Sequence, residues 1–147
     1  MKASLVKRQK GAAALEFVAV FVIFFAVFYG VVSYGLPMLM LQSFNQASSE
    51  AVRRCVALDP ASASYRRDID QMARKVLGEQ LAWMPGSLDF QLASDASITL
   101  TPGNLLTVNI DYSKAKLTSV LPVIDLPVIG EVPRLPASLK ASASLQL

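Results

Sequence analysis

Hydrophobic and polar residues divide the chain into an apolar N-terminal part and a mixed remainder. No residue from Phe17 to Leu41 is charged. At about 1.5 Å per residue, a helix of that length reaches about 38 Å, enough to cross a hydrocarbon core of about 30 Å. A cleavable secretory signal has an apolar region of only about 7 to 15 residues and a small-x-small cleavage site behind it. The longer run, which ends in Pro37 to Leu41, therefore predicts a retained single-pass anchor.

The residues after Leu41 turn polar but keep a helical pattern, so we predict one helix over residues 12–58. Gly35 and Pro37 interrupt it. Because proline removes a backbone donor and clashes with the preceding turn, a helix kink or local melting is predicted there. Asp59 and Pro60 end this helix, and a second, amphipathic helix is predicted over residues 65–83.

Beyond the second helix the apolar period changes to two, which predicts a small antiparallel sheet. The expected strands are Leu88–Ala93, Ser97–Thr101, Leu105–Tyr112 and Leu139–Leu147, with a hairpin turn at Pro102 to Asn104. Four prolines lie within residues 120–136 and exclude a regular central strand. That segment is predicted to be an extended apolar loop or edge strand that packs on the sheet or rests near the membrane. The fold class is therefore α+β.

The distribution of charged residues predicts the orientation of the anchor in the membrane. The net charge of +3 comes mostly from a short, poorly structured leader, residues 1–11, with Lys2, Lys7, Arg8 and Lys10 and no acid. Residues 42–147 hold ten basic and ten acidic residues, so no basic face for nucleic acid is indicated. The positive-inside rule then predicts a cytoplasmic N-terminus and an extracytoplasmic domain over residues 59–147.

Residues that carry chemistry are scarce. The chain has no histidine, which removes the commonest general base and metal ligand, and its seven glycines form no phosphate-binding loop. The acids do not cluster at metal-ligand spacing. We therefore expect no enzymatic activity, no metal, no cofactor and no small-molecule substrate. Cys55 is the single cysteine, so it is either a buried thiol or one that pairs with another chain.

A motif at the start of the anchor carries the functional prediction. Basic residues Lys7, Arg8 and Lys10 precede Gly11, three alanines follow, and Glu16 and Phe17 open the apolar run. A carboxylate at the head of a membrane helix is costly, so it is a functional residue by default.

The string from Lys10 to Phe17 resembles the processing site of type IV pilin-like proteins. In that class a prepilin peptidase cuts after the glycine, and a glutamate is the fifth residue of the mature chain. Counted from Ala12, Glu16 is the fifth. The alanine-rich string and Glu16-Phe17 are most similar to TadE-like minor pseudopilins of tight-adherence (Tad/Flp, type IVb-like) pilus systems.

The resemblance implies a bacterial inner-membrane protein, shaped like a type IV pilin lollipop, that serves pilus assembly, cell adhesion and biofilm formation. Its implied partners are prepilin peptidase, other pilin or pseudopilin subunits and the lipid bilayer. Gly11 and Ala12 would form the processing site, and Glu16 and Phe17 the assembly determinants. Two alternatives stay open: an unprocessed signal-anchored periplasmic binding module, and a minor pseudopilin of the type II secretion or type IVa class, although Ala12 stands where those classes usually have Phe or Met. The resemblance is compatible with incorporation into the filament and with retention in the membrane as a platform factor.

Overall fold

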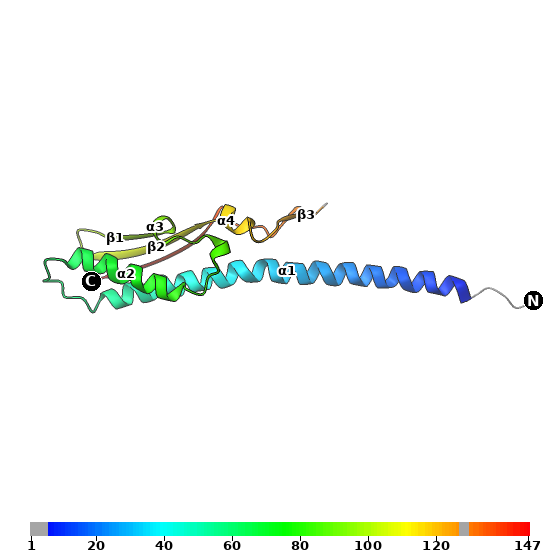
Figure 1. Ribbon diagram of the computed structural model, residues 1–147, viewed down its shortest axis with the longest axis horizontal. Coiled ribbons are helices and arrows are strands. Elements are labelled where there is room, and N and C mark those ends of the chain that lie inside the picture. The colour runs from blue at the N-terminus through cyan, green and yellow to red at the C-terminus, as the bar shows by residue number, and fades with distance from the viewer. Residues whose placement is uncertain (1–5, 127–129) are drawn as a thin grey trace, which may run out of the picture.

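A single long helix organises the structure, a computed structural model that describes residues 6–126 and 130–147. Helix α1, Val6–Cys55, projects from a small domain built on its C-terminal half (Figure 1). The other helical elements are α2 (Tyr65–Gln80), the short 3-10 turn η1 (Gly86–Leu88), α3 (Leu92–Asp95) and α4 (Lys114–Thr118). The strands are β1 (Ala96–Leu100), β2 (Leu105–Ser113), β3 (Ile124–Leu126), β4 (Gly130–Val132) and β5 (Ser138–Gln146).

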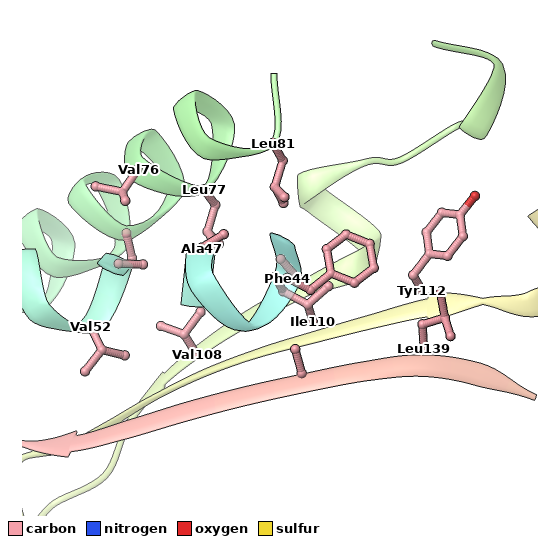
Figure 2. Close-up of a cluster of buried hydrophobic side chains, with 14 of the residues drawn as sticks. Phe44, Ala47, Val52, Val76, Leu77, Leu81, Val108, Ile110, Tyr112 and Leu139 are labelled. Carbon is pink, nitrogen blue, oxygen red and sulfur yellow. The ribbon is translucent and has the colours of Figure 1, made fainter. Parts of the chain in front are cut away.

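The domain packs on one stripe of α1. Its buried members recur every three or four residues, as one face of a helix requires: Ser33, Pro37, Met40, Phe44, Ala47, Ser48, Ala51, Val52 and Cys55. Small residues in this stripe let α2 approach closely, and Figure 2 shows α1 packed between α2 and the strands. Ile69, Ala73, Val76 and Leu77 supply the facing side of α2. The C-terminal half of α1 is thus a core helix of the domain.

The main sheet is antiparallel, in the order β1-β2-β5. Leu106, Val108, Ile110 and Tyr112 of β2 alternate with exposed or half-buried residues and point into the core, as a half-buried strand predicts. Asn104 has a positive φ of 59° in the turn between β1 and β2. The α+β fold class, the hairpin and the last strand are confirmed.

An aromatic cluster joins α1 to the sheet. The ring centroid of Phe44 lies 5.6 Å from that of Phe90 and 5.9 Å from that of Tyr112. The Tyr112 hydroxyl donates to the Leu88 carbonyl at 2.6 Å, so a buried polar group is satisfied.

The predicted strand over residues 88–93 is wrong. Asp89 adopts a left-handed conformation with φ 47°, which breaks an extended chain, and α3 follows from Leu92. The Asp95 carboxylate accepts from the backbone N–H of Gln91 at 2.8 Å and fixes this turn. Apolar residues two apart enter the core here from an irregular loop, which the alternating pattern does not distinguish from a strand.

Two boundaries and one predicted interruption also differ from the structure. Helix α1 begins at Val6, inside the segment predicted to be a poorly structured leader, and α2 ends at Gln80. Helix α1 continues as α-helix through Gly35 and Pro37, so the predicted local melting is wrong, while a kink stays a prediction. Pro37 is buried against the domain, which holds the helix in place where its hydrogen-bond ladder lacks one donor.

Residues 120–136 contain a second, two-stranded sheet, with Ile124 opposite Val132 and Asp125 opposite Glu131. Its strands lie along α1 beyond the main sheet, toward the exposed half of the helix (Figure 1). Of the alternatives left open by the sequence, the structure therefore shows short strands beside the anchor. Pro127 lies outside the described residues.

Candidate functional site: the exposed half of the N-terminal helix

The N-terminal half of α1 is apolar and uncovered. Every residue from Gly11 to Phe28 is exposed, and this stretch contains half of the large exposed hydrophobic residues of the described chain. Within residues 6–126 and 130–147, α1 is the one helix long and apolar enough to cross a membrane. A large exposed apolar surface of this kind marks a membrane or protein contact. The helix therefore anchors the chain by a single pass.

The structure moves the span toward the N-terminus. Met40 is fully buried in the domain core and Leu36 packs against it, so neither is free to contact lipid. The stretch from Ala12 to Val32, which lies outside the main core, reaches about 32 Å, close to the thickness of a hydrocarbon core. The apolar run Phe17–Leu41 thus has two roles, which sequence hydropathy by itself does not separate.

This shift places Glu16 about one turn inside the span. Its side chain is exposed, and no ion pair to it occurs among the side chains that the structure describes. Ala12 lies four residues earlier, which puts the two residues on neighbouring turns of one helix face. Lys7, Arg8 and Lys10 lie on the helical backbone, but their side chains lie outside the described part. Groups that interact with the Glu16 carboxylate must therefore come from another subunit or from the bilayer.

Phe17 starts an aromatic column along the helix. Its ring stacks on Phe21 with centroids 6.1 Å apart, and Phe21 stacks on Phe25 at 6.3 Å. A second pair, Phe24 and Phe28, lies at 6.2 Å. The column stiffens the exposed surface next to the predicted processing site.

Gly11 lies within the helix, and a Cβ placed there would meet no described atom within 4 Å. The same is true of Gly35. Neither glycine is required for packing inside this chain. A requirement for Gly11 would therefore have to come from another protein that reads or cuts the segment.

The far end of α1 carries charge of its own. Glu50 accepts from Arg53 at 2.9 Å and from Arg54 at 2.8 Å. Arg54 and then Arg53 hold the pKa of the Glu50 carboxyl below its usual range. Cys55 is buried, and its Sγ lies 3.7 Å from the Ile69 carbonyl. Burial raises the pKa of the Cys55 thiol, so it is shielded and protonated at neutral pH.

The anchored helix, with a small antiparallel domain on its outer half, defines a single-pass, pilin-like α+β protein. Residues 11–53 match the family model described as TadE-like protein. The matched segment begins at Gly11 and ends just before α1 does, so it covers the exposed and buried halves of that helix alike. This match agrees with the resemblance that the Gly11 to Phe17 motif indicates. No curated protein and no solved structure matches the chain.

Sequence reasoning missed Tyr29 and Tyr34, which join α1 to the segment of short strands. The Tyr29 hydroxyl donates to the Pro122 carbonyl, and the Tyr34 hydroxyl accepts from the Arg134 backbone N–H at 2.9 Å. In the sequence both tyrosines lie within the uncharged run from Phe17 to Leu41. Their hydroxyls, placed near the outer end of the span, were the signal that a polar partner lies there.

Proposed function

We propose that this protein is a minor pseudopilin of a Tad pilus, cut by a prepilin peptidase between Gly11 and Ala12 and assembled through α1. The observation that carries the proposal is the exposed apolar half of α1, which opens with the Gly11 to Phe17 motif and falls within the TadE-like match. On this proposal the N-terminus is cytoplasmic, because the leader charges precede the span.

Cleavage would change the electrostatics of the helix end. It removes Lys2, Lys7, Arg8 and Lys10 and creates an α-amine on Ala12. The first turn of a helix favours a nearby negative group, and Glu16 lies one turn away. An acid within a span costs up to about 2.5 to 3.5 kcal/mol on insertion scales, and a paired charge costs less.

Glu16 would then set the register of subunits. A neighbouring subunit's α-amine offers the one cation that cleavage creates at membrane depth, so the pair forms only between processed chains. Head-to-tail contacts that do not close produce a filament. The same contact would serve a platform role if the subunit stays in the membrane.

The first test is the mass and N-terminal sequence of the protein from its host membrane, with and without the prepilin peptidase. We expect a chain that starts at Ala12 only when the peptidase is present. A chain that keeps residues 1–11 in both strains favours the alternative, a signal-anchored binding module.

Two variants separate processing from assembly. Gly11→Leu should abolish the cut, with Gly35→Leu as the matched control, because both glycines have open surroundings in the fold. Glu16→Gln should be cut normally and yet lose pilus formation. Normal pilus formation with Glu16→Gln would contradict the proposed role of the Glu16 carboxylate.

A further inference from the structure

The two short strands β3 and β4 form a sheet apart from the main one, and they lie beside the exposed half of α1 (Figure 1). Residues 119–123 and 133–137 connect them to the domain and contain no helix or strand. Among the described residues, β3 pairs only with β4, and neither strand contributes a side chain to the main core. The strand pair is thus joined to the domain by two irregular connections.

The contact between this strand pair and α1 is apolar. Ile124 and Val132 face Phe21, Phe25 and Ala26 across a cavity of about 230 Å³. At the base of the pair, Tyr29 donates its hydroxyl to the Pro122 carbonyl. The strand pair therefore covers one face of α1 between Phe21 and Tyr29.

That face lies at membrane depth. The bilayer needs about 20 helical residues, and the stretch of α1 from Ala12 to Val32 lies outside the main core. Residues Phe21 to Tyr29 run from the middle of this stretch toward the domain. Without them, Ala12 to Val20 would reach about 14 Å, roughly half of the hydrocarbon core.

The strand pair is not compatible with lipid. Asp125 and Glu131 lie opposite each other across the two strands, and each is a carboxylate that is costly in hydrocarbon. Glu131 is paired with Lys114 at 2.6 Å, which adds a third charged group at the same level. The outer edges of a two-stranded sheet also expose backbone donors and acceptors, which do not occur facing lipid.

We propose that β3–β4 and the acyl chains of the membrane leaflet nearest the domain compete for the same face of α1. When α1 spans a bilayer, the strand pair leaves Phe21 and Phe25 and lies in water above the membrane, and the contact from Tyr29 to Pro122 breaks. When the helix is out of the bilayer, the pair closes over that face as seen here. The inference rests on α1 being an anchor, and does not depend on cleavage at Gly11 or on assembly.

The test uses the full chain with Cys55→Ala, reconstituted in nanodiscs of phosphatidylethanolamine and phosphatidylglycerol, whose two faces are both open to solvent. Ala26→Cys with Val132→Cys reports the closed contact through disulfide formation with copper phenanthroline. Ser49→Cys with Ala143→Cys is the matched control, because those residues line one surface hollow between α1 and β5. We expect the control pair to cross-link and the Ala26/Val132 pair to stay reduced.

A second measurement follows Val132→Cys alone with a water-soluble, membrane-impermeant maleimide. We expect labelling within about threefold of Lys140→Cys on the exposed face of β5, because thiolates react in water. Cross-linking of Ala26 with Val132 in the bilayer would overturn the proposal, since the pair would then be closed on a membrane-embedded helix. Labelling of Val132→Cys slower by about tenfold or more would overturn it too, since the strands would then be immersed in lipid. The cross-linking and labelling results do not depend on cleavage at Gly11 or on assembly of the protein into a filament.

Discussion

Both halves of α1 carry large apolar side chains, but these side chains have opposite surroundings. Phe24, in the N-terminal half, is 64% exposed, whereas Phe44, in the C-terminal half, has no exposed surface. One continuous helix thus acts as a membrane anchor over one half and as a domain core over the other. The difference shows that hydropathy identifies the residues that must be removed from water, but not whether lipid or protein covers them.

Truncating one phenylalanine in each half of α1 tests this difference with the largest expected effect. Phe44→Ala should lower the free energy of unfolding of the domain by about 3 to 5 kcal/mol, because it leaves a cavity between Phe90 and Tyr112. Phe24→Ala should change it by less than about 0.5 kcal/mol. Urea titration followed by Trp83 fluorescence would measure both. Equal losses would mean that the exposed half also belongs to the folding unit.

Two carboxylates extend the comparison to charge. Asp95 is 6% exposed, and its carboxylate binds Lys116 Nζ at 2.8 Å, while Glu16 has no ion pair among the described side chains. Lys116→Met should cost about 2 to 3 kcal/mol, because it leaves a buried acid without its cation. Adding Asp95→Asn should restore part of that loss, and Glu16→Gln should leave the urea midpoint unchanged. A midpoint that Lys116→Met does not move would show that the ion pair contributes nothing.

The smallest expected effect concerns the tyrosines. Burial raises the pKa of Tyr112 to about 12, helped by the nearby charges of Asp95 and Asp89. Because the folded state holds this proton more tightly than the unfolded state, stability is complete below the unfolded pKa of about 10 and falls as pH rises toward 12. Tyr112→Phe should cost about 1 kcal/mol at pH 7 by losing the bond to Leu88, and should flatten that alkaline decline.

Tyr34→Phe is the matched control for that measurement, because its hydroxyl lies at the exposed base of the strand pair. Thermal unfolding between pH 8 and pH 11.5 would compare the two variants. An alkaline decline of the same steepness in Tyr112→Phe and the parent would assign the loss to other groups.

The sequence predicted the elements whose pattern is local. The long helix, α2, the hairpin of β1 and β2, and β5 each have a periodicity and a turn signal that a single segment carries. The short motif from Gly11 to Phe17 was also recognisable in the sequence, and the match over residues 11–53 agrees with the resemblance that it indicates. These features depend on neighbours a few residues away.

Prediction from the sequence failed where contacts between distant parts of the chain determine the structure. Leu88 and Phe90 alternate like a strand, yet Asp95 and the packing of Phe90 on Phe44 hold them in a loop. Residues around Leu36 and Met40 are as apolar as a membrane span, yet the domain covers them. No local pattern records which surface a distant part of the chain brings against these residues.

By itself the sequence determined that this protein has one apolar helix of membrane length, a processing-like motif at its start and a small α+β domain behind it. Only the tertiary structure decided which part of α1 the domain covers, and that β3 and β4 lie against the exposed half of the helix. The physical reason is that periodicity encodes which residues must leave water, whereas the identity of what covers them is a property of the folded surface.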